Sequence, residues 1–184
     1  MPVRNNLLGE AAAAARGVVA VVIGDREASR FFNLTTHGLA GSFIALLVVT
    51  GIGAYLPVLL GYNGRVLLSV AVFALSFVLQ VGCGTIALMQ AKRLDGFVPY
   101  LVVDNWASVY VSIAGLAFNL MGVGDDIIGV PIGFLIVIVA VNIGRVIIKL
   151  EPLQTGMFVV AQVVGYLVGG IAITALLAVL RLSS

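Results

Sequence analysis

Asp104 and Arg145 are two ionisable residues that lie inside long apolar segments of this 184-residue chain. A charge at the centre of a membrane helix costs about 3 kcal/mol, so such residues are usually paired or functional. Asp104 lies about two helical turns inside its segment, and Arg145 lies about one turn from the end of the next segment. These similar depths predict an intramembrane ion pair, which either locks two helices together or responds to protons or to a ligand.

Polar and small side chains recur at helical spacing within the same apolar segments. Residues three or four positions apart share one face of a helix, and lipid offers such polar groups no hydrogen-bond partner. We therefore expect them to point into a bundle, where interhelical hydrogen bonds and close packing are their ordinary role. The alternative is a polar path for a solute or an ion between the second and third apolar segments. The predicted polar face consists of Gln80, Ser108, Ser112, Asn119, Asn142 and Gln162, and the small-residue motifs are Gly129-x-x-x-Gly133 and Gly165-x-x-x-Gly169.

Motifs of enzymes and of cofactor sites do not occur in the sequence. There is no G-x-S-x-G, H-E-x-x-H or P-loop pattern, and Cys83 and His37 are the single cysteine and the single histidine. We therefore predict no catalytic residue, no metal site and no cofactor. Nucleic-acid binding is excluded as well, because no basic run is present that would neutralise several phosphates.

Lys92, Arg93 and Lys149 lie at the ends of apolar segments. Basic residues in such positions attract anionic lipid headgroups, so membrane lipids are predicted partners. The same placement also follows from the ordinary excess of Lys and Arg on the cytoplasmic side of membrane proteins.

The composition requires a membrane to position these residues. Charged residues make up 10% of the chain, against about 25% in a soluble domain, and hydrophobic residues make up 61%. Five windows are long enough to cross the hydrocarbon core, which takes about 20 apolar residues. They cover residues 38–60, 65–91, 97–122, 127–149 and 153–180. Tyr100 and Trp106, with Tyr55 and Tyr62 at the opposite side, fit the aromatic belts of such a protein.

The N-terminal region is harder to assign. Residues 7–23 are apolar, but Glu10 and Arg16 interrupt them and a charged stretch follows at once. This pattern favours an amphipathic helix in the interface plane, with a sixth span as the alternative.

The distribution of Lys and Arg predicts the orientation. Of the ten Lys and Arg residues, eight fall on one side of the five spans and two, Arg65 and Arg181, fall on the other. The N-terminus is therefore predicted to be cytoplasmic and the C-terminus external. The eight basic residues are Arg4, Arg16, Arg26, Arg30, Lys92, Arg93, Arg145 and Lys149.

Two segments carry a resemblance to known proteins. Residues 31–43 (FFNLTTHGLAGSF) lead directly into the first span, and residues 100–109 (YLVVDNWASV) open the third. In these segments the chain resembles small bacterial membrane proteins that are similar to the Yip family of five-span proteins. The resemblance implies the same orientation, a place in the bacterial cytoplasmic (inner) membrane, and action through protein or lipid partners. The acidic-Tyr-Gly-Pro motif of the eukaryotic members has no match here, so a trafficking role is not implied.

We therefore expect an all-α protein, with residues 1–37 as a cytoplasmic or interfacial segment and residues 38–184 as a five-helix transmembrane bundle. Small-residue faces without catalytic motifs predict a non-enzymatic scaffold or accessory subunit, whose partner is a second copy or another membrane protein. The alternative is a small transporter or channel with a polar path along the third span. An enzyme acting on lipid at the cytoplasmic interface is a more distant alternative.

Overall fold

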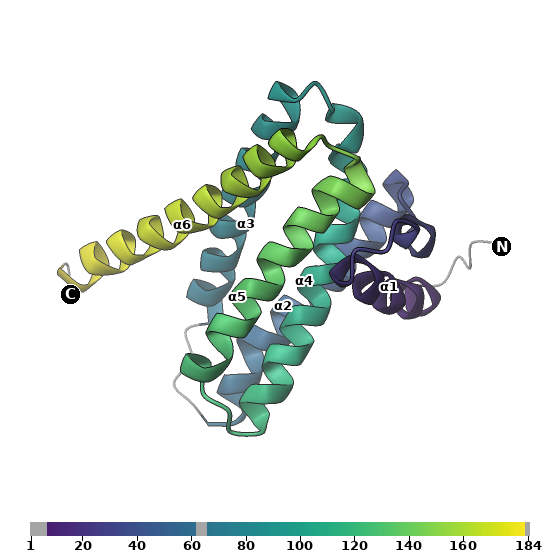
Figure 1. The fold of residues 1–184 in the computed structure, drawn as a ribbon. Helices are drawn as coiled ribbons and strands as arrows, with labels where there is room; N and C mark the ends of the chain where they lie inside the picture. Colours follow the sequence, from purple (N-terminus) through teal and green to yellow (C-terminus); the bar gives the residue numbers. More distant parts are fainter. Residues whose placement is uncertain (1–6, 62–65, 183–184) are drawn as a thin grey trace.

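The computed structural model describes residues 7–61 and 66–182, without the side chains of residues 57, 125, 126 and 173–182. The described residues form helices and no strand, as predicted for an all-α protein (Figure 1). The α-helices are α1 (Leu7–Val22), α2 (Thr36–Leu59), α3 (Val66–Gln90), α4 (Phe97–Leu120), α5 (Asp125–Asn142) and α6 (Pro152–Leu182). Three short elements join them: the 3-10 helices η1 (Ala28–Phe31) and η2 (Leu94–Gly96), and the π-helical turn η3 (Ile143–Ile148).

Five of the described helical segments are long and apolar enough to cross a membrane, which confirms the predicted number of spans. They are Thr36–Leu56, Val66–Gln90, Leu94–Leu120, Ile127–Ile148 and Pro152–Ala172. Residue 65, where the second span was predicted to begin, lies outside the described residues. The chain thus has the architecture of an integral membrane protein.

The N-terminal helix α1 packs on the outside of the bundle, at an angle to α4 and α5 (Figure 1). It is not among the helices with the length and composition of a span. Gly17 permits close packing of Phe32 on α1, because an added Cβ there would lie 2.5 Å from the Phe32 ring. This position beside the spans agrees with the predicted interfacial helix and disfavours a sixth span.

Hydrogen bonds from the spans hold α1 in place. Asn142 Nδ2 donates to the carbonyl oxygens of Val21 (2.8 Å) and Val22 (3.3 Å), and Tyr110 Oη donates to that of Ala11 (2.6 Å). The last carbonyls of a helix have no partner within the helix, so Asn142 satisfies two of them. A residue predicted for the polar bundle face thus caps the N-terminal helix.

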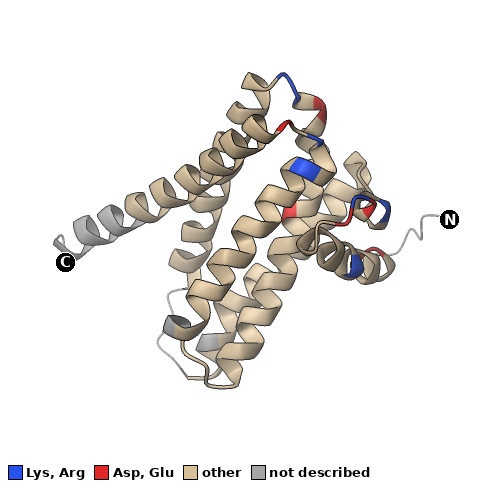
Figure 2. Cartoon of the chain, viewed as in Figure 1, with Lys and Arg blue, Asp and Glu red and all other residues tan. Residues whose placement is uncertain are grey.

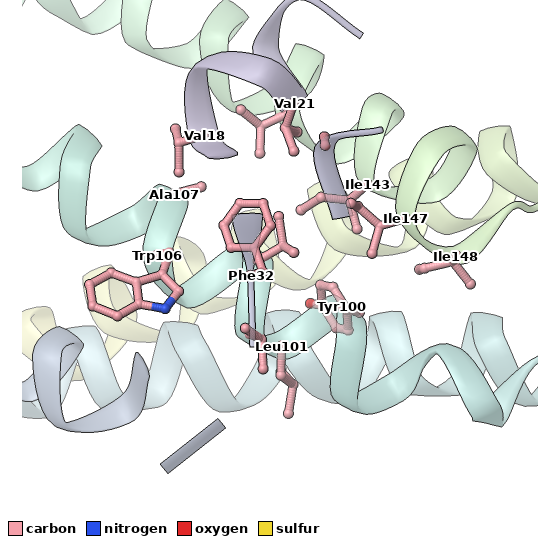
Figure 3. Packing of buried hydrophobic residues seen from close by; sticks show 14 of the residues in the cluster. Val18, Val21, Phe32, Tyr100, Leu101, Trp106, Ala107, Ile143, Ile147 and Ile148 are labelled. Atoms are coloured by element: carbon pink, nitrogen blue, oxygen red, sulfur yellow. The ribbon is translucent and has the colours of Figure 1, made fainter. Parts of the chain in front are cut away.

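A hydrophobic core fills the half of the bundle nearest to α1 (Figure 3). Side chains of α1, the first half of α4 and the η3 turn meet there; those in view include Val18, Val21, Phe32, Tyr100, Leu101, Trp106, Ala107, Ile143, Ile147 and Ile148. Tyr100 and Trp106 are buried, with 0% and 3% of their surface exposed. Their prediction as belt residues was therefore wrong, because both side chains pack inside the bundle and not at the membrane interface.

Helices that are distant in sequence make the main pairs. The most extensive contacts join α3 to α6 and α2 to α4. Gly165 and Gly169 explain the first pair. An added Cβ at Gly165 would lie 2.8 Å from Gln80 Cα, and one at Gly169 would lie 3.0 Å from Ser76 Oγ. These two glycines let the α6 backbone approach α3 closely, as small residues do in membrane helix pairs.

The two ends of the bundle differ in charge and in packing. The described Lys and Arg residues lie towards the end that carries α1, η2 and η3 (Figure 2). From their connection at this end, α5 and α6 diverge (Figure 1). The far halves of the spans expose large apolar side chains, including Leu67, Leu120, Val130, Phe134 and Ile171.

Candidate functional site

A cluster of polar side chains lies where α3, α4 and α6 approach one another. Gln80 Nε2 donates to Gln162 Oε1 at 3.2 Å, which links α3 to α6. An added Cβ at Gly84 would lie 3.2 Å from Tyr100 Oη and 3.5 Å from Gln162 Cγ, so both side chains reach the same point of α3. Cys83 lies one turn after Gln80 on α3, and Asp104 lies one turn after Tyr100 on α4. The cluster therefore comprises Gln80, Cys83, Tyr100, Asp104 and Gln162.

Several buried polar atoms of the spans lack a partner. Within residues 7–61 and 66–182, Tyr100 Oη, Asn105 Oδ1 and Gln162 Nε2 are buried and form no hydrogen bond. Asn105 uses its amide nitrogen, which donates to Ser42 Oγ at 3.0 Å and joins α4 to α2. A buried polar group without a partner costs about 1–3 kcal/mol. The interior therefore combines interhelical hydrogen bonds with unsatisfied polar atoms next to Asp104.

The predicted ion pair does not form: the described residues contain no contact of ion-pair length between Asp104 and Arg145. Asp104 is 8% exposed, on the same face of α4 as Tyr100, which stacks edge-to-face on Phe158 of α6. Arg145 is exposed and lines a groove between η3 and α6. The two side chains therefore lie in different surroundings: Asp104 is in the buried interior, and Arg145 is at an exposed groove.

The predicted polar face is brought together only in part. Gln80 and Gln162 form a hydrogen bond, Asn142 caps α1, and Ser108 is partly buried. Ser112 and Asn119 are exposed, because they lie in the far half of α4, where the neighbouring helices have diverged. These residues therefore do not form a continuous polar path along α4, between α3 and α4.

The predicted headgroup residues also separate into two kinds. Lys92 and Lys149 are exposed, and each adopts a left-handed backbone conformation, with φ of 54° and 59°. The Arg93 guanidinium instead donates to the carbonyl oxygens of Ile148 and of Lys149 (3.0 Å), and it pairs with Asp95 at 3.2 Å. Arg93 therefore ties the end of α3 to the end of η3 and is committed to protein partners.

A second polar contact, which sequence reasoning missed, joins α1 to the start of α2. Glu10 Oε1 accepts a hydrogen bond from Asn33 Nδ2 at 2.9 Å, and His37 Nδ1 lies 3.9 Å from the same oxygen. The Glu10 side chain is 11% exposed, and that of His37 is 73% exposed. The signal in the sequence was the isolated Glu10 within an apolar helix. The contact holds α1 against the start of α2.

No group of three or more His, Cys, Asp or Glu side chains that would hold a metal ion occurs in the described part of the chain. Comparisons with protein-family models, with curated proteins and with solved structures found no match. The functional argument therefore rests on packing, charge and the membrane setting.

Proposed function

We propose that this chain is a non-enzymatic scaffold or accessory subunit of the bacterial cytoplasmic membrane that associates with a second copy of itself. The N-terminus would be cytoplasmic and the C-terminus external, since the described Lys and Arg residues gather at the end that carries α1. Action through protein or lipid partners agrees with the resemblance to Yip-like proteins seen in residues 31–43 and 100–109.

The outer face of α5 is the observation that carries this proposal. Gly129 and Gly133 lie one turn apart, and an added Cβ at either would meet no atom within 4 Å. The equivalent motif of α6 is used inside the molecule, against α3. Val130 and Phe134 beside the α5 glycines are 65% and 68% exposed. A helix of a second copy would approach closely over the glycines and pack against these two side chains.

Replacement of Gly133 by leucine is expected to weaken self-association about tenfold, because overpacking a helix contact costs about 1–3 kcal/mol. The measurement is the dissociation constant of the purified full chain in a non-ionic detergent, by analytical ultracentrifugation. Gly82→Leu is the matched control, since Gly82 lies on α3 and an added Cβ there also meets no atom within 4 Å. Equal dissociation constants for wild type and Gly133→Leu, or a wild type that stays monomeric, would contradict the proposal.

Transport is the second candidate, and the buried polar cluster around Asp104 is the observation in its favour. Cys83 of this cluster is partly buried and gives a direct test. For a packed scaffold, a membrane-impermeant maleimide is expected to leave Cys83 unlabelled in sealed vesicles, and to label it after denaturation in SDS. Rapid labelling from either side of the native membrane would instead favour a water-filled path and a transporter.

A further inference from the structure

A groove of about 500 Å³ lies between the end of α5, the η3 turn and the start of α6. Its lining is mainly apolar and consists of Val141, Arg145, Leu150, Pro152, Thr155, Gly156, Val159 and Val160. Gly156 leaves space in it, since an added Cβ there would meet no atom within 4 Å. The groove lies beside the connection from which α5 and α6 diverge, so in a bilayer it opens towards lipid.

Arg145 is the charged residue of this groove. Its side chain is exposed, and it forms no ion pair among the residues that the structure describes. Arg93, by contrast, is occupied by the carbonyl oxygens of Ile148 and Lys149. An arginine within a span is usually paired, and no described carboxylate lies in ion-pair contact with Arg145.

The backbone around Arg145 is unusual as well. Residues Ile143–Ile148 form a π-helical turn, a rare element that is frequent at functional sites. The turn ends at Lys149 in the left-handed conformation, and Pro152 then begins α6. This connection directs α6 away from α5 and so opens the groove beside Arg145.

We propose that the groove binds one anionic phospholipid, with its phosphate on Arg145 and one acyl chain along Val141, Gly156 and Val160. Apolar walls suit an acyl chain, and the unpaired guanidinium suits a phosphate, for which it offers a planar fork of donors. A phospholipid satisfies both parts at once and is present wherever this chain is inserted. The assignment is independent of self-association, because the groove and the Gly129–Gly133 face involve different residues.

The test titrates the purified full chain in a non-ionic detergent with phosphatidylglycerol or with phosphatidylcholine of the same acyl chains, and native mass spectrometry counts the bound lipid. Wild type is expected to bind one phosphatidylglycerol more tightly than phosphatidylcholine. Arg145→Gln is expected to lose about fivefold in phosphatidylglycerol affinity, as one basic residue at a membrane surface contributes about 1 kcal/mol. Its phosphatidylcholine affinity should fall less, because the choline cation offsets the phosphate charge of that lipid, and Arg145→Lys should keep most of the preference.

Filling the groove is expected to weaken the binding of both lipids. Gly156→Leu should lower the affinity for phosphatidylglycerol and for phosphatidylcholine alike, whereas Gly82→Leu on α3 should lower neither affinity. Equal elution profiles and melting temperatures of the variants and wild type establish that they are folded. A lipid preference that survives Arg145→Gln, or binding that Gly156→Leu leaves intact, would overturn the proposal. Displacement of the lipid by equimolar inorganic phosphate would overturn it too, since the acyl chain would then contribute nothing.

Discussion

Replacement of Gly165 by leucine is expected to lower the free energy of unfolding by about 3 kcal/mol, since inserting side-chain atoms into a packed contact costs up to about that amount. An added Cβ at this position would already lie 2.8 Å from Gln80 Cα and 2.8 Å from the Leu79 carbonyl oxygen. Both are backbone atoms of α3, so they cannot move aside as a flexible side chain would. Relief requires the separation of α3 and α6, which also breaks the hydrogen bond between Gln80 and Gln162.

The measurement is an SDS titration in mixed micelles, followed by far-UV circular dichroism. Gly170→Leu is the matched control on the same helix, because an added Cβ at Gly170 meets no atom within 4 Å. The two variants add the same side chain and remove the same glycine from α6, so their difference isolates the contact with α3. Equal stabilities would show that α6 does not pack on α3 through Gly165.

The number of spans and the charge asymmetry were predictable from the sequence, because both depend on composition over long windows. Hydropathy identifies an apolar segment of about 20 residues without reference to its neighbours. The packing role of Gly165 and Gly169 was predictable as well, because two glycines at this spacing permit close approach of another helix. The sequence does not show which helix packs against such a motif. Gly129 and Gly133 have the same spacing, but no other helix of the chain packs against them among the described residues.

Pairing between helices was the part that the sequence could not supply. The sequence predicts similar depths for Asp104 and Arg145, but the rotation of each helix about its own axis decides whether their side chains meet. That rotation is set by contacts such as Tyr100 with Phe158 and Asn105 with Ser42, which join residues more than 50 positions apart. The capping of η3 by Arg93 depends on such a long-range contact too, at a sequence separation of 56 for its bond to Lys149.

Tyr100 is the residue whose truncation should destabilise the α4 core most. It is 0% exposed, and its ring packs edge-to-face on Phe158 with a centroid distance of 5.1 Å. Tyr100→Ala is expected to cost about 3 kcal/mol or more, as for other large aromatic residues replaced by alanine in a core. The space left would lie among α3, α4 and α6, where Gly84 offers no side chain to fill it.

Tyr100→Phe separates the contribution of the ring from that of the hydroxyl. The described residues offer Tyr100 Oη no hydrogen-bond partner, although it is buried. Removing a buried hydroxyl that has no partner relieves its desolvation cost, so this variant should be as stable as wild type or more stable by about 1 kcal/mol. The same SDS titration measures both variants. If Tyr100→Phe is instead destabilised by more than about 1 kcal/mol, the hydroxyl has a hydrogen-bond partner in the membrane. That result would favour transport through the polar cluster around Asp104.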